Sequence, residues 1–160
     1  MPFIAIDTPV GRLGIAERDG QIVRVSWSPS PDGDNTWPAP DGEPTPLMVE
    51  AGRQMTAYFA GELTAFDLPL DPGGSVLERG VFDAMRAIPY GQTRTYGDIA
   101  SALGTYGQPV GQACGANPIP VIIPCHRVLS ATGLGGYSGA GGIETKIALL
   151  KLEGGYPMLL

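Results

Sequence analysis

The sequence predicts an α/β N-terminal unit with a small antiparallel sheet, followed by a mainly helical C-terminal domain that resembles a helix-turn-helix. Short apolar segments rich in β-branched residues, separated by turn residues, fill most of the first thirty positions. From Ser75 onward the apolar residues recur instead at helical spacing. Asp71-Pro72-Gly73-Gly74 separates the two patterns and breaks regular structure. We therefore predict one domain over residues 1–72 and a second over residues 73–160.

The N-terminal unit is expected to contain three strands, a loop, one helix and a closing strand. The strands cover residues 3–6, 13–16 and 22–27, with Asp19-Gly20 suited to a tight hairpin. Residues 28–44 are rich in proline and glycine and form a loop. Thr45 is the expected N-cap of a helix that ends at Gly61, and a short strand follows over residues 66–70. The expected buried stripe of the helix comprises Leu47, Ala51, Met55 and Phe59.

The C-terminal domain is expected to contain four helices. Ser75 and Glu78 form a capping box for the first, and Thr95 caps the second. The third covers residues 108–114, and the last runs from about residue 143 to residue 153. Two short helices joined by a turn at Gly104 fit a helix-turn-helix, although ordinary helical hairpins share this pattern. An apolar run over 119–123 and a small hairpin over 128–134 precede the last helix. The residues expected to face the core are Leu77, Val81, Met85, Ile88, Ile99, Ala100 and Leu103.

The charge balance bears on the choice of partner. A net charge of −6 argues against a nucleic-acid ligand. The excess of acidic residues is confined to residues 1–74, which carry a net charge of −7, whereas residues 75–160 carry +1. The second domain is therefore close to neutral, and a nucleic-acid partner remains compatible with it.

The sequence shows no apolar run of membrane-spanning length and no secretory signal pattern. Cys114 and Cys125 are the only cysteines, and without an export signal we expect both as free thiols in a reducing cytoplasm. Two cysteines and one histidine are too few for an ordinary Cys/His zinc site. We expect a cytoplasmic monomer with no metal, no cofactor and no membrane partner.

Cys125 and His126 are the candidate catalytic pair. A free cysteine is only about 3% thiolate at neutral pH, so a nearby base strengthens it as a nucleophile. Neighbouring residues seldom direct their side chains at each other, and we therefore predict a relay through water from Cys125 to the histidine. In the alternative interpretation Cys125 is a small core residue and His126 lies on the surface.

Several segments of the chain match one family pattern in order and spacing. In the C-terminal half these are residues 90–100 (YGQTRTYGDIA), Asn117-Pro118, residues 123–128 (IPCHRV), 133–139 (GLGGYSG), Thr145-Lys146 and 149–153 (LLKLE). Residues 58–61 (YFAG) and 66–70 (FDLPL) extend the match to the N-terminal unit. Together they closely resemble the O6-alkylguanine-DNA alkyltransferase family. The resemblance implies a winged helix-turn-helix-like C-terminal domain that carries the reactive cysteine.

The resemblance also implies roles for individual residues. Cys125 is the alkyl acceptor, and His126 with Glu153 behind it is the base relay. Asn117 braces the turn that presents the cysteine, and Tyr96 donates a hydrogen bond to the guanine ring as it leaves. The backbone carbonyls of Cys125 and Val128 accept from the exocyclic amine of the base. The residues expected to line the lid near O6 are Tyr137 and Ser138. The implied partner is alkylated double-stranded DNA, approached from the minor groove, and the target base must leave the duplex.

The chain departs from the family pattern where the family has an arginine that fills the vacated base stack. Gln108 occupies this position. No lysine or arginine lies between Arg94 and Arg127, so phosphate contacts are expected from these two arginines, helix N-termini and backbone amides. Duplex binding is accordingly expected to be weak.

Three hypotheses follow. The first is DNA repair by irreversible, stoichiometric alkyl transfer to Cys125. The second keeps this chemistry for single strands, free alkylated bases or small alkylating metabolites, because residue 108 is Gln. The third is a module that binds lesions without reacting, against which the Cys125-His126 pair argues. A cysteine hydrolase is also conceivable, but it needs an oxyanion hole that the sequence does not locate.

Overall fold

The computed structural model describes residues 3–27, 43–137 and 141–154. It divides into two compact units, residues 1–72 and 73–160. Most of the predicted loop over residues 28–44 lies outside the described residues. No helix in the described part of the chain has both the length and the apolar character that crossing a membrane requires.

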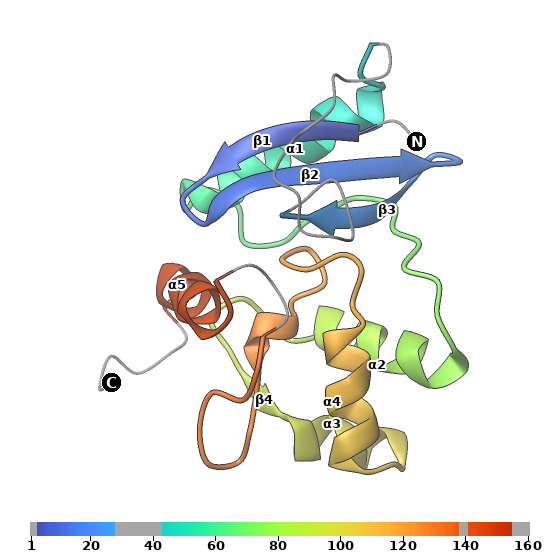
Figure 1. Ribbon diagram of the computed structural model, residues 1–160, viewed down its shortest axis with the longest axis vertical. Helices are drawn as coiled ribbons and strands as arrows, with labels where there is room; N and C mark the ends of the chain where they lie inside the picture. The colour runs from blue at the N-terminus through green and yellow to red at the C-terminus, as the bar shows by residue number, and fades with distance from the viewer. Residues whose placement is uncertain (1–2, 28–42, 138–140, 155–160) are drawn as a thin grey trace. The chain divides into compact units, whose positions relative to one another are not determined.

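The N-terminal unit contains a three-stranded antiparallel sheet in the order β1-β2-β3 (Figure 1). The strands are β1 (Phe3–Thr8), β2 (Gly11–Arg18) and β3 (Gln21–Ser26). Asp19 and Gly20 join β2 to β3, and both have positive φ, 53° and 77°. A tight hairpin turn of the predicted kind needs such angles. The three predicted strands are confirmed; β1 and β2 are longer than expected, and β3 begins and ends one residue earlier.

Helix α1 (Pro46–Phe59) packs against the sheet, and the Oγ1 of Thr45 caps its first turn by accepting from the Met48 amide at 3.2 Å. A Cβ at Gly52 would lie 2.9 Å from the Ile4 side chain, so helix and strand approach closely there. The inward face of α1 includes Ala51 and Met55 as predicted, but it is rotated away from Leu47 and Phe59. The buried apolar side chains are Met48, Ala51, Met55 and Tyr58, whereas Leu47 and Phe59 are only partly buried.

The predicted strand over residues 66–70 is wrong. Only Leu70 forms a bridge, parallel to Ile22, with the Ile22 amide donating to the Pro69 carbonyl at 2.8 Å. Pro69 has no N–H to donate, so a longer ladder cannot form here.

The C-terminal unit is mainly helical, with α2 (Val76–Arg86), α3 (Tyr96–Leu103), α4 (Gly107–Gly115) and α5 (Ile143–Glu153). Capping boxes at Ser75 and Thr95 begin α2 and α3 as predicted. Gly104 ends α3 with a φ of 68° and starts the turn into α4. The short strand β4 (Arg94–Thr95) pairs in parallel with β5 (Val128–Leu129).

Two expectations for this unit need correction. Leu77 and Leu103 are each 37% exposed, whereas Phe82, which was not among the predicted core residues, is buried. The hairpin over 128–134 is reduced to a bridge between Ser130 and Gly133, because β5 pairs with β4 instead.

Candidate active site

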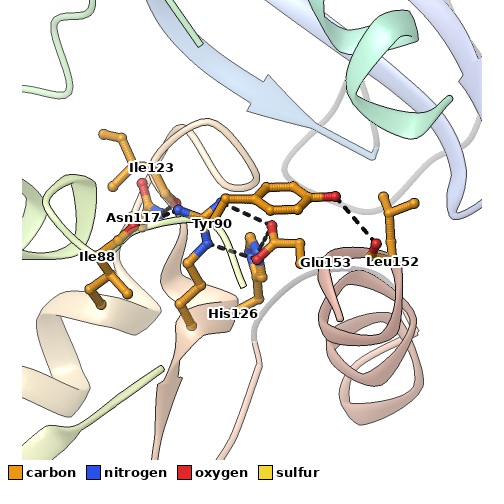
Figure 2. A network of polar contacts seen from close by, with 8 residues as sticks. Ile88, Tyr90, Asn117, Ile123, His126, Leu152 and Glu153 are labelled. Atoms are coloured by element: carbon orange, nitrogen blue, oxygen red, sulfur yellow. Dashed lines mark hydrogen bonds and ion pairs between the residues drawn. The ribbon is translucent and has the colours of Figure 1, made fainter. Parts of the chain in front are cut away.

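A strained turn presents Cys125. The Ile123 amide donates to the Ile119 carbonyl at 2.9 Å, and Val121 between them has a φ of 72°. This left-handed conformation costs a β-branched residue about 1–3 kcal/mol. Asn117 holds the turn from inside, because its side-chain amide donates to the Ile123 carbonyl at 2.8 Å (Figure 2). Its side-chain oxygen accepts from the Ile119 amide at 2.9 Å. The side chain of Asn117 thus closes both ends of the turn.

Cys125 starts a 3-10 turn, η1 (Cys125–Arg127), and is 6% exposed. It lines a pocket of about 240 Å³ together with Tyr96, Gly111, Cys114, Gly115, Gly136 and Tyr137. Burial raises the pKa of the Cys125 thiol, while a hydrogen bond from Asn117 and the charge of Lys146 act in the opposite direction. At neutral pH the resting thiol is protonated, and a reaction at sulfur needs a proton acceptor.

His126 and Arg127 share one buried carboxylate, that of Glu153 (Figure 2). The Nε2 of His126 lies 2.7 Å from Glu153 Oε2. The guanidinium of Arg127 donates two hydrogen bonds to the same carboxylate, from Nε at 2.8 Å and from Nη2 at 3.0 Å. Its Nη1 donates to the Ile88 carbonyl at 2.7 Å, and Tyr90 lies beneath the guanidinium at 5.8 Å. The charge of Glu153 is therefore largely balanced by Arg127.

This balance sets the protonation of His126. Burial lowers the pKa of the imidazole, and the charges of Arg127 and Lys146 lower it further, against the opposing effect of Glu153. A carboxylate held by a guanidinium only accepts hydrogen bonds, so Nε2 carries the proton of the neutral ring. The Nδ1 of His126 has no hydrogen-bond partner among the described residues. A neutral histidine with a free Nδ1 lone pair is what a base next to Cys125 requires.

Lys146 is a site residue to which sequence reasoning gave no role. It is fully buried, and burial lowers its pKa. Its Nζ donates to the carbonyls of Val128 at 2.6 Å and Gly136 at 3.0 Å, and lies 6.0 Å from the ring centre of Tyr96. The lysine thus ties β5 to the segment that carries Tyr137. A lysine three and four positions before two leucines of the same helix lies on its inward face, and this spacing was the available signal.

Family models match nearly the whole chain. Residues 3–72 match the ribonuclease-like domain of 6-O-methylguanine DNA methyltransferase, and residues 77–155 match the DNA binding domain of the same protein. The chain belongs to the 6-O-methylguanine DNA methyltransferase family.

Relatives of this methyltransferase family resemble the chain along its length. A methylated-DNA–protein-cysteine methyltransferase of Mycolicibacterium paratuberculosis is 44% identical over 94% of this chain and 91% of its own. The protein of the same name from Methanosarcina acetivorans is 41% identical over 96% and 99%. The crystal structure of Mycobacterium tuberculosis OGT in complex with DNA matches with a TM-score of 0.82 and 42% identity, covering 95% of this chain and 92% of that one.

The structure brings most of the predicted site residues of this methyltransferase together. Cys125, Tyr96 and Tyr137 line one pocket, and His126 and Glu153 form a hydrogen bond beside it. Tyr96 is partly buried, and burial raises the pKa of its hydroxyl. The carbonyl of Val128 already accepts from Lys146, which leaves it one lone pair. Ser138 lies outside the described residues.

The residues predicted to contact DNA lie in different surroundings. Arg94 is exposed, with its guanidinium near the Thr93 carbonyl, and Gln108 is exposed in the first turn of α4. The guanidinium of Arg127, which was predicted to contact phosphate, is buried and engaged by Glu153 and the Ile88 carbonyl. The sequence did not show that its nearest acceptor would be an interior carboxylate. Within the described residues, no three His, Cys, Asp or Glu side chains are grouped as a metal site needs.

Cys114, the second free cysteine, is a buried residue of α4. Its Sγ packs against the Met85 sulfur at 3.6 Å, and it also lines the same pocket as Cys125. Burial raises its pKa to about 12, which leaves almost no thiolate at neutral pH. Two thiols therefore face one pocket, with only Cys125 next to a base.

Proposed function

We propose that this protein repairs DNA by transferring the alkyl group of O6-alkylguanine irreversibly to the sulfur of Cys125, one group per protein molecule. The observation that carries the proposal is the buried thiol of Cys125 on a pocket, followed by a neutral His126 whose Nδ1 is available as a base. Membership of the methyltransferase family supports the substrate, and the relatives carry the corresponding name.

The chemistry follows from the contacts. The thiol proton passes, through water, to Nδ1 of His126, and the imidazolium that forms is stabilised by Glu153 at 2.7 Å. The sulfur attacks the alkyl carbon, a C–S bond forms as the C–O6 bond breaks, and the electron pair remains with guanine. Tyr96 donates a hydrogen bond to the leaving base, and the proton held by His126 returns through water to the guanine, which departs neutral. The product is a thioether without an easy hydrolysis route, so the protein reacts once.

The partner is alkylated duplex DNA, with α4 approaching from the minor groove and the target base turned out into the pocket. Extrusion costs a few kcal/mol and must be offset by contacts to the opened duplex. The burial of Arg127 leaves Arg94 as the single exposed cation predicted to contact phosphate. We therefore propose weak, weakly salt-dependent duplex binding by a monomer, in the reducing cytoplasm where both thiols stay free.

A second candidate function is the same transfer from substrates that need no base extrusion. The observation that favours it is the shortage of cations on α4 together with Gln108 at the position of the family's arginine. Single-stranded DNA and the free alkylated base are the substrates that separate this candidate from duplex repair.

The test is the intact mass of the protein after incubation with duplex, single-stranded or free O6-methylguanine. We expect one methyl group per molecule, mapped to Cys125, with no turnover. Cys125→Ala should not react, whereas Cys114→Ala should still take up the group. Multiple turnovers, or label on Cys114 alone, would contradict the proposal. A duplex that reacts no faster than the free base would favour the second candidate.

A further inference from the structure

Tyr106 stands at an unusual place for an exposed aromatic residue. It is the N-cap of α4 and is 81% exposed. Ser, Thr, Asp and Asn are the residues that cap helices, and Tyr106 makes no side-chain capping bond. Its ring and hydroxyl have no aromatic, cationic or hydrogen-bond partner among the described residues. Neither helix capping nor packing within the protein accounts for this side chain.

Helix α4 links Tyr106 to the reactive pocket. Gly111 and Gly115 of this helix line the pocket with Cys125. Gly107 lies one turn before Gly111, so the three glycines form one face of the helix. A Cβ at any of them would meet nothing within 4 Å. Tyr106 precedes Gly111 by five residues, about 7.5 Å along a helix axis.

Packing against the described residues does not require glycine at these three positions. Each helical glycine costs about 0.5–1 kcal/mol relative to alanine, and none of the three has positive φ. The open space beside them lets a large ligand come close to the helix backbone. The helix itself carries no charged side chain, so an approaching phosphate backbone meets no repulsion there. Tyr106 directly precedes the first of these glycines, at the N-terminal end of α4.

A base that leaves a duplex exposes the faces of its former neighbours. Proteins that open DNA fill such gaps with apolar wedges, or stack aromatic and guanidinium groups on the exposed bases. The amide of Gln108 is neutral and offers no aromatic face, whereas the tyrosine two residues earlier does. We propose that Tyr106 enters the duplex beside the target nucleotide and stacks on the bases exposed by its extrusion. The inference rests on the proposed function, in which the flipped base enters the Cys125 pocket.

The experiment compares transfer rates on a duplex and on the corresponding single strand, because only the duplex has a stack to be filled. Aromatic stacking on a base corresponds to about 5- to 150-fold in rate or affinity. We expect Tyr106→Ala to lower the ratio of duplex to single-strand rates by this factor, and Tyr106→Phe and Tyr106→Trp to keep it. Val76→Ala is the matched control, since Val76 is 91% exposed on α2, outside the site. It should leave the ratio unchanged.

A second measurement does not depend on transfer. With Cys125→Ser protein, 2-aminopurine placed next to the lesion reports stacking through its fluorescence. We expect Tyr106 to quench the probe and Tyr106→Ala to release the quenching. Equal rate ratios for the wild type and Tyr106→Ala, or quenching that is independent of Tyr106, would overturn the proposal. Absence of transfer from every substrate would refute the proposed function, while the fluorescence would still decide the role of Tyr106.

Discussion

Replacement of His126 by glutamine isolates the base from the rest of the site. A glutamine amide can still donate to Glu153, so the pair between Glu153 and Arg127 stays satisfied, but the side chain cannot accept a proton from the thiol. General-base assistance is worth about 10²–10⁴-fold. Because burial raises the Cys125 pKa above 9.0, less than about 1% of the thiol is ionised at pH 7 without help. We therefore expect the transfer rate of the His126→Gln protein at pH 7 to be about 10²–10⁴-fold lower than that of the wild type.

The pH profile gives the sharper comparison. The His126 pKa is lowered from 6.5, so the base form predominates above pH 6.5 and is lost only as the pH falls through the lowered value. Wild-type protein should therefore react at a nearly constant rate from pH 6.5 to 8.5. The His126→Gln rate should instead rise about tenfold per pH unit over this range, following thiolate formation. Single-turnover transfer rates, measured by mass spectrometry across this pH range, test both pH profiles. Identical profiles for the two proteins would exclude His126 as the base.

Other substitutions probe the support of the site. Asn117→Ala should lower the free energy of unfolding by about 2–3 kcal/mol, measured with urea, because two buried hydrogen bonds of the strained turn are lost. Lys146→Met should slow transfer and shift thiol ionisation, followed by absorbance at 240 nm, to higher pH, since its charge lowers the Cys125 pKa. Gly111→Ala should stabilise the protein by about 0.5–1 kcal/mol, because the added Cβ meets no neighbouring atom. It should nevertheless slow transfer by narrowing the pocket, and a transfer rate equal to that of the wild type would contradict the position of Gly111 in the pocket wall. Gln108→Arg should raise the rate on duplex DNA and leave the free-base rate nearly unchanged, and equal effects on both would contradict the predicted position of α4.

The sequence predicted the local structure well where one residue type decides it. Thr45, Ser75 and Thr95 cap helices because their hydroxyls satisfy exposed amides, and such signals are readable without tertiary information. Helical faces were predicted less well. The close approach at Gly52 decides which side of α1 turns inward, and periodicity alone does not contain this distance.

The sequence indicated a candidate nucleophile and a candidate base, but it did not indicate how the charged groups around them are paired. Cys125 and His126 are adjacent in the sequence, and their chemistry is visible from residue type. The partner of Arg127 is not visible in the sequence, because an arginine can bind a DNA phosphate or a buried carboxylate equally well. Its partner Glu153 lies 26 positions away, and only the packing of α5 against η1 brings the two together.

The last helix supplies both charged groups that make the cysteine usable. Lys146 and Glu153 are seven residues apart, two turns of α5, and so project from the same face. Lys146 lowers the pKa of the buried thiol, whereas Glu153 orients the imidazole that takes the proton. If Glu153 acted alone, its charge would favour a protonated His126, which could not serve as a base. Arg127 offsets that charge, and the site thereby keeps a neutral histidine beside a protonated thiol until substrate arrives.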